Sequence, residues 1–111
     1  MGTFDAIQRI CNLPREFRDG EKSPRDLVRE IRIDVRSLTT DSIAAVLKTK
    51  PELVAQWLQW SEDKRSSPGY YFMSDGQRHI VGYYPGDEQV EFADTIAACA
   101  DFVVKEVNAM C

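Results

Sequence analysis

The sequence lacks the features that direct a chain into or across a membrane. It holds no run of about 18 apolar residues, the length that a membrane-spanning helix needs. Its first ten residues have no basic flank, no apolar stretch and no small-residue cleavage site, so we expect no secretory signal. Cysteine is scarce, and the odd number at unrelated spacings predicts free thiols in a reducing compartment: Cys11, Cys99 and Cys111. We therefore expect a cytoplasmic protein with no membrane partner.

The sequence is also poor in groups that carry catalysis. His79 is the only histidine and falls within a predicted strand, and no spacing of cysteines around it suits zinc. The glycines are isolated, so no loop is rich enough in glycine to cradle a phosphate. Carboxylates are plentiful, but the pairs Glu62-Asp63 and Asp87-Glu88 fall in predicted turns. We expect a protein that is not an enzyme and that has no catalytic residue, no metal and no cofactor.

What the sequence does contain is typical of one globular domain, which we assign to residues 1–111. Hydrophobic residues make up 43% and charged residues 29%, and a chain of this length can bury one core without disulfides. The net charge of −4 is unevenly divided: residues 1–66 hold 12 basic and 11 acidic side chains, whereas residues 67–111 hold 2 and 7. An acidic surface attracts basic protein surfaces and repels nucleic acid, although a merely solubilising face has the same composition.

Residues 1–66 are predicted to be mainly helical. Thr3 can cap a first helix that ends near Leu13-Pro14, after which the charged residues 15–22 are expected to form a loop. Ser23-Pro24 is typical of a helix start, with serine at the N-cap and proline in the first turn.

Residues 30–36 leave two interpretations open. Their apolar positions continue the helical spacing of the preceding residues, yet they also alternate as a strand would. We favour the helix, because the start signals ahead of it are good. Two further helices are expected, one capped near Thr39 and one opened by Pro51, before a clear break at residues 66–69.

From residue 67 the periodicity changes to that of strands. Residues 67–92 predict a three-stranded antiparallel meander, with a hairpin signal at Asp75-Gly76 and a second turn at Pro85-Gly86. Asp94 is a suitable cap, and residues 94–110 predict an amphipathic helix. The expected fold class is α+β: N-terminal helices, a three-stranded antiparallel meander and a C-terminal amphipathic helix.

Aromatic residues cluster in the meander and in the helix before it. Successive side chains of a strand point to opposite faces, so the pairs Tyr70-Tyr71 and Tyr83-Tyr84 must each place one ring on the face away from the last helix. Two arrangements are open. Either the N-terminal helices cover that second face and bury its rings, or the face is exposed and its rings can contact a partner.

The segment over residues 43–60 resembles the repressor-type helix-turn-helix, in which Pro51 would open the second helix. This resemblance implies a small DNA-binding regulator. The segment departs from that family, because Lys48 stands at the position of the usual turn glycine, and the second helix offers only Gln56 and Gln59 to contact bases. A helical bundle with a proline-initiated helix would give the same pattern, so the regulator is kept as the alternative hypothesis.

Residues 43–108 resemble small cytoplasmic bacterial immunity proteins, which neutralise toxins delivered between competing cells, contact-dependent inhibition toxins included. The similar parts are the step from Trp57 to Arg65, the Pro-Gly-Tyr-Tyr start of the first strand and the Ala-Cys-Ala-x-Phe run of the last helix. The similarity is to a general pattern. It implies a non-enzymatic α+β inhibitor that binds a cognate toxin domain, such as a nuclease with a basic active-site cleft.

An inhibitor of this kind needs acidic side chains to meet a basic cleft and aromatic side chains to supply binding energy. We expect two groups of contact residues. One comprises the acidic turn and third strand, with the cap of the last helix adjoining. The other comprises the end of the helix before the meander together with tyrosines of the meander. Along the chain, the expected contacts are Trp60, Glu62, Asp63, Tyr70, Tyr83, Asp87, Glu88, Glu91 and Asp94.

Overall fold

The fold is α+β, as the sequence predicts. The computed structural model describes residues 3–20, 23–31, 38–63, 69–75, 77–84, 86 and 89–110. Their elements, in chain order, are α1 (Thr3–Cys11), α2 (Leu13–Asp19), α3 (Pro24–Ile31), α4 (Thr40–Thr49), α5 (Glu52–Asp63), β1 (Gly69–Ser74), β2 (His79–Tyr84), β3 (Gln89–Phe92) and α6 (Thr95–Met110).

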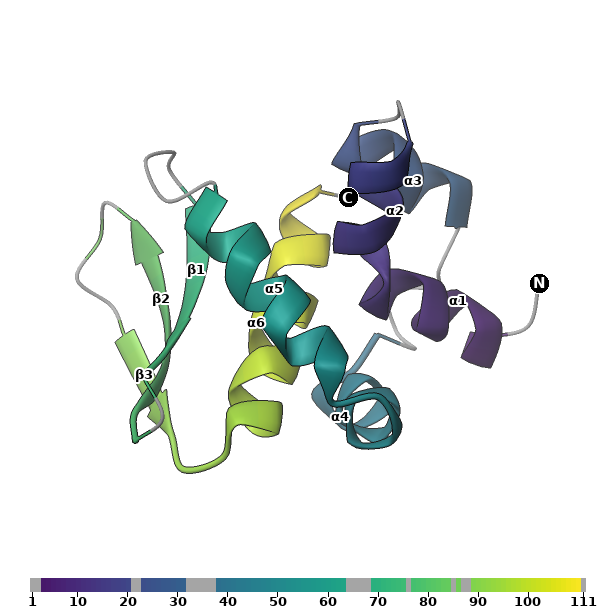
Figure 1. Ribbon diagram of the computed structural model, residues 1–111. Helices are drawn as coiled ribbons and strands as arrows, with labels where there is room; N and C mark the ends of the chain where they lie inside the picture. The colour runs from purple at the N-terminus through teal and green to yellow at the C-terminus, as the bar shows by residue number, and fades with distance from the viewer. Residues whose placement is uncertain are drawn as a thin grey trace.

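The three strands form one antiparallel sheet in the order β1-β2-β3. The sheet stands at one end of the molecule with α5 and α6 beside it, and α1, α2 and α3 lie beyond those two helices (Figure 1). The helices α4 and α6 also pack closely together. The long helix α6 is therefore central, because it contacts the sheet as well as the helices α3, α4 and α5.

The inner face of the sheet packs on α6. The register pairs Phe72 with Val81, both of which are buried, and the Phe72 ring stacks on Phe102 of α6 with centroids 5.9 Å apart. Trp57 of α5 is fully buried against Phe102, and its indole N–H donates a 3.0 Å hydrogen bond to the backbone carbonyl of Cys11. Burial of such large rings is the main source of stability in a core of this size.

Helix α5 lies along the free edge of β1. The backbone N–H of Phe72 donates a 2.7 Å hydrogen bond to the hydroxyl of Ser61, which is buried on the inward side of α5. Phe72 belongs to the edge strand, so this N–H would otherwise be an unpaired donor. A side chain of the helix thus replaces the missing neighbouring strand.

The outer face of the sheet is exposed, which decides between the two arrangements left open by the sequence. Met73 is 44% exposed and Tyr84 is 50% exposed, and the strands' main helical contacts are with α5 and α6. On this face the ring of Tyr71 lies over Gly82, where a Cβ atom would overlap it. The Tyr71 hydroxyl accepts a 2.7 Å hydrogen bond from Gln89, so one side chain spans all three strands.

Several helix limits agree with the sequence signals. Thr39 and Ser42 form a capping box at the start of α4, with hydrogen bonds of 3.1 Å in both directions. Asp94 accepts hydrogen bonds from the first N–H groups of α6, and Asp75 accepts 3.0 and 2.7 Å bonds from the N–H groups of Gln77 and Arg78 in the hairpin. Capping and turn chemistry therefore explain these boundaries.

The loop expected over residues 15–22 is wrong in its first part. Residues 15–19 belong to α2, because Pro14 lies in the first turn of a second helix, where a missing N–H has no cost, rather than ending the first one. Leu13 is fully buried and Gly20 follows the last residue of α2. Of residues 30–36, residues 30 and 31 end α3, whereas 32–36 lie outside the described residues.

Candidate protein-binding surface

Two of the expected contact residues meet on the inner face of the sheet. Tyr70 and Tyr83 are register partners, and their rings form an edge-to-face pair with centroids 5.0 Å apart. Tyr70 is half-buried and Tyr83 is 41% exposed. The Lys105 ammonium lies 5.9 Å from the centroid of the Tyr70 ring, which places the pair beside the half-buried Lys105 of α6.

Exposed apolar side chains gather on the sheet. Among the described residues, five large hydrophobic side chains are exposed, and four of them belong to the strands: Met73, Tyr83, Tyr84 and Val90. The fifth is Phe17, on α2. A sheet that presents apolar side chains from both of its faces is a typical location for protein contact.

The expected acidic contacts have structural partners of their own. Glu91 is exposed on the outer face, where its carboxylate lies 3.5 Å from the Arg78 guanidinium. Asp94 is exposed and caps α6. Because Tyr70 and Tyr83 lie on the inner face, the sheet separates Glu91 from the tyrosine pair. Asp87 and Glu88 lie outside the described residues.

The expected contact residues on α5 do not form one surface, because some pack inside the protein and others are exposed. The Trp60 ring packs between Phe17 and Trp57, and its N–H donates a 3.0 Å hydrogen bond to the largely buried carboxylate of Glu106. The half-buried ring of Trp60 is thus part of the packing of α2, α5 and α6. Glu62 is exposed, and Asp63 is the last residue of α5, with a side chain outside the described residues. No ring contact joins Trp60 to the tyrosine pair among the described residues.

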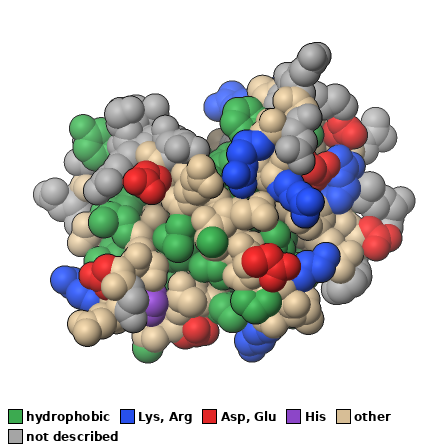
Figure 2. All heavy atoms as spheres, in the orientation of Figure 1, with side chains coloured by type: hydrophobic (Ala, Val, Ile, Leu, Met, Phe, Trp, Pro, Cys, Tyr) green, Lys and Arg blue, Asp and Glu red, His purple; other side chains and the backbone are tan. Residues whose placement is uncertain are grey.

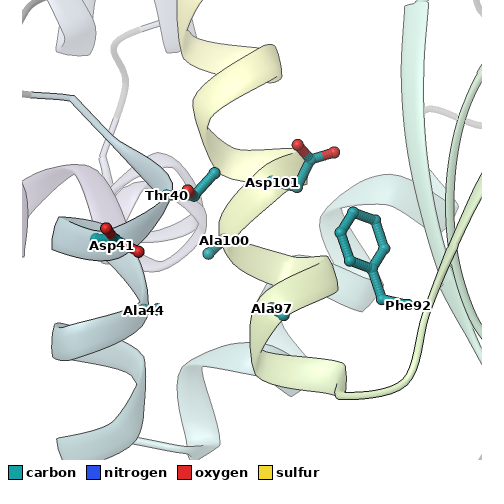
Figure 3. Close-up of a pocket in the computed structure, with 7 residues that line it drawn as sticks. All are labelled: Thr40, Asp41, Ala44, Phe92, Ala97, Ala100 and Asp101. Carbon is teal, nitrogen blue, oxygen red and sulfur yellow. The ribbon is translucent and has the colours of Figure 1, made fainter.

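A groove that the sequence did not indicate lies along α6. It has a volume of about 240 Å³ and runs across α6 between α4 and the end of β3 (Figure 3). Its lining residues are Thr40, Asp41, Ala44, Phe92, Ala97, Ala100 and Asp101. The sequence does show small residues and an acid at helical spacing in α6, but it does not show that α4 and β3 flank them.

The charge of the surface differs between the helices and the sheet. Lys and Arg side chains gather over the side of the molecule where α1, α2 and α3 lie (Figure 2). The exposed arginines of α2 and α3 are Arg15, Arg18, Arg25 and Arg29. Around the sheet the exposed acids among the described residues are Asp75, Glu91 and Asp94, and the exposed base is Arg78. The sheet therefore exposes mainly acids, whereas α1, α2 and α3 expose arginines together with acids such as Asp5 and Asp26.

The segment that resembles a helix-turn-helix is packed in a way that disfavours DNA contact. Helix α5 contacts β1, α6, α2 and α4, so little of it remains free to enter a groove. Its exposed side chains include Glu52, Gln59 and Glu62, and the Gln59 amide oxygen accepts a 3.4 Å hydrogen bond from Arg18. Two carboxylates on the candidate recognition helix repel phosphates.

The side chains best suited to catalysis, a histidine and two cysteines, pack or form hydrogen bonds within the fold. Ser74 and His79 are cross-strand partners joined at 2.7 Å, and among the described residues no carboxylate orients the histidine ring. Burial raises the pKa of Cys11 to about 12 and also raises the pKa of Cys99, so neither thiol is a nucleophile at neutral pH. The described residues contain no group of three or more His, Cys, Asp or Glu side chains placed to hold a metal.

Comparisons with protein-family models, curated proteins and solved structures found no match to this chain. Within the described part of the chain, no helix is both long enough and apolar enough to cross a bilayer.

Proposed function

We propose that this protein is a cytoplasmic immunity protein that binds a cognate bacterial toxin domain, for example a nuclease, and blocks its basic active-site surface. The observation that carries the proposal is the concentration of exposed apolar side chains on a sheet within the acidic part of the chain. Tyr83 and Tyr84 supply large rings that are not needed in the core.

The energetics of tight complexes support this assignment. Binding energy concentrates in a few aromatic anchors that become buried, whereas charges at the rim set the association rate and the specificity. The pair of Tyr70 and Tyr83 is a partly rigid anchor, because each ring already packs against the other. Glu91, with Asp87 and Glu88 shortly before it in the sequence, then supplies the long-range attraction to a basic partner.

The proposal is tested with the toxin domain encoded by the neighbouring reading frame. Binding and protection are measured for the wild type and for a triple variant in which Asp87, Glu88 and Glu91 are changed to Lys. We expect slower association, weaker protection and a smaller dependence of the association rate on salt. The exposed Glu91 contributes about 1 kcal/mol or less to folding, so its change should alter stability little.

A matched triple variant controls for net charge. Asp5, Asp26 and Glu52 are exposed on α1, α3 and α5, and changing them to Lys alters the net charge equally on the helical side. This control should retain most of the protection. A triple variant at Asp87, Glu88 and Glu91 that folds normally and protects as well as the wild type would refute the role of the acidic residues. A wild-type protein that does not bind the toxin domain would refute the proposed function.

A further inference from the structure

The groove on α6 has the size and chemistry of a site for one side chain. Its volume of about 240 Å³ is smaller than the roughly 300–1,000 Å³ of pockets that take small molecules. The floor is formed by Ala97 and Ala100 of α6, with Ala44 of α4 beside them (Figure 3). A long, flexible stem can lie on such a floor without displacing any large side chain.

The charge of the groove selects a cation. Its lining contains two carboxylates, Asp41 on α4 and Asp101 on α6, and no basic residue. The carboxylate oxygen Oδ2 of Asp101 is buried and is paired with the Lys105 ammonium at 2.8 Å. Lys105 is not part of the lining, and its ion pair takes up only one of the two carboxylate oxygens. The carboxylate of Asp101 therefore retains capacity to accept hydrogen bonds from a donor in the groove.

The ring in the groove selects arginine over lysine. Phe92 and Asp101 lie on the same side of α6, and the carboxylate stands next to the Phe92 ring (Figure 3). A guanidinium group stacks on aromatic faces and donates parallel hydrogen bonds to a carboxylate, whereas an ammonium group is a compact, strongly hydrated charge. Asp41 adds negative potential from the opposite wall.

We propose that this groove binds an arginine side chain of the partner protein, with the stem on the alanine floor and the guanidinium between Phe92 and Asp101. The identification of that partner as the toxin domain rests on the proposed function, whereas the preference for arginine rests on the groove alone. The groove belongs to the flank of α6 that faces β3, so it extends the docking surface from the sheet onto the helices.

The first experiment measures the chemistry of the groove with the isolated, full-length protein. The ¹⁵N-labelled protein is titrated with N-acetyl-arginine amide, and the amide shifts of Ala97, Ala100 and Asp101 are followed. We expect saturable shifts at these positions in the millimolar range, with several-fold weaker shifts for N-acetyl-lysine amide. N-acetyl-norleucine amide, which lacks the charge, should give no saturable shift. Equal shifts for all three probes, or none for arginine, would overturn the proposal.

Matched variants test whether the shifts caused by N-acetyl-arginine amide come from binding in the groove. Ala97→Leu fills the groove, whereas Ala45→Leu places the same side chain on an exposed position of α4 that does not line it. Asp101→Asn removes the charge beside Phe92 with little change in volume. We expect Ala97→Leu and Asp101→Asn to weaken the arginine response at least five-fold and Ala45→Leu to leave it unchanged. Equal responses of Ala97→Leu and the wild type would overturn the proposal.

A second experiment measures how tightly the variants bind the toxin domain. Ala97→Leu should weaken its binding at least ten-fold relative to Ala45→Leu, with both variants folded by their amide spectra. Protection by the wild type together with unchanged binding by Ala97→Leu would refute the groove and leave the proposed function standing. An arginine response without any binding of the toxin domain would support the groove and refute the proposed function.

Discussion

Two buried cysteine thiols make the stability of the folded protein depend on pH. Cys11 and Cys99 are fully buried, and burial, which disfavours the thiolate, is the largest cause of the raised pKa of each one. In the unfolded chain a cysteine ionises near pH 8.5, whereas these thiols stay protonated in the folded protein to much higher pH. The folded state therefore binds more protons than the unfolded state above about pH 8.5, and stability must fall as pH rises.

The resulting prediction concerns alkaline unfolding. Between about pH 8.5 and pH 11, each buried thiol should reduce the free energy of unfolding by about 1.4 kcal/mol per pH unit. Urea unfolding at several pH values measures this slope. Cys99→Ala should remove about half of the thiol-dependent slope, whatever its effect on stability at pH 7. An unchanged slope in both Cys99→Ala and Cys11→Ala would show that the folded-state pKa values of these thiols are not raised.

At the scale of elements, Ser61 joins α5 to the edge of the sheet. Ser61→Ala should cost about 1–3 kcal/mol of unfolding free energy, because the buried N–H of Phe72 loses its 2.7 Å acceptor. Chemical denaturation measures the cost, and hydrogen exchange localises it. The Phe72 amide should exchange faster relative to the other core amides of β1 and β2. A variant with wild-type stability and unchanged protection at Phe72 would contradict this role for Ser61.

The strands are joined by the side chain of Tyr71, which lies over Gly82. Gly82→Ala should destabilise the protein by about 1 kcal/mol or more, because the new Cβ displaces the ring and breaks its hydrogen bond with Gln89. In a Tyr71→Ala background the same substitution should be neutral or stabilising, because alanine is favoured over glycine in a strand without that overlap. A double-mutant cycle of unfolding free energies measures the coupling. Equal costs in both backgrounds would contradict it.

At the scale of the whole molecule, the described residues around the sheet expose mainly acids, whereas the helices also expose arginines. Duplex DNA should not bind specifically at physiological salt, because the candidate recognition helix exposes Glu52 and Glu62 and packs on four neighbouring elements. Fluorescence anisotropy with labelled duplexes tests this, and changing both glutamates to Lys should increase only non-specific, salt-sensitive binding. A footprint that disappears on changing Gln56 or Gln59 would instead support the helix-turn-helix regulator.

The sequence predicts this fold well where local chemistry sets the boundaries. The hairpin follows from Asp75, whose carboxylate accepts two backbone N–H bonds, and the start of α6 follows from Asp94. Pro14 alone does not decide the boundary, because proline is compatible both with the end of one helix and with the first turn of the next.

The candidate site is less predictable because it depends on distant packing. Sequence alternation correctly places one tyrosine of each pair away from α6, but it cannot show that the rings of Tyr70 and Tyr83 meet. Trp60 is packed against Phe17, a residue 43 positions earlier in the chain that the sequence predicts to lie in a loop. The groove on α6 is likewise formed by three elements that are far apart in the sequence.

The contact between Ser61 and the edge of β1 also limits how copies of this protein can assemble. A sheet with two open edges can add strands from both sides and grow into a filament. Here α5 occupies the edge of β1, so within the described residues only β3 offers an open edge. Two copies that pair through β3 would have an occupied edge at each end of the joint sheet. Strand pairing between native molecules therefore ends at a closed dimer and cannot propagate.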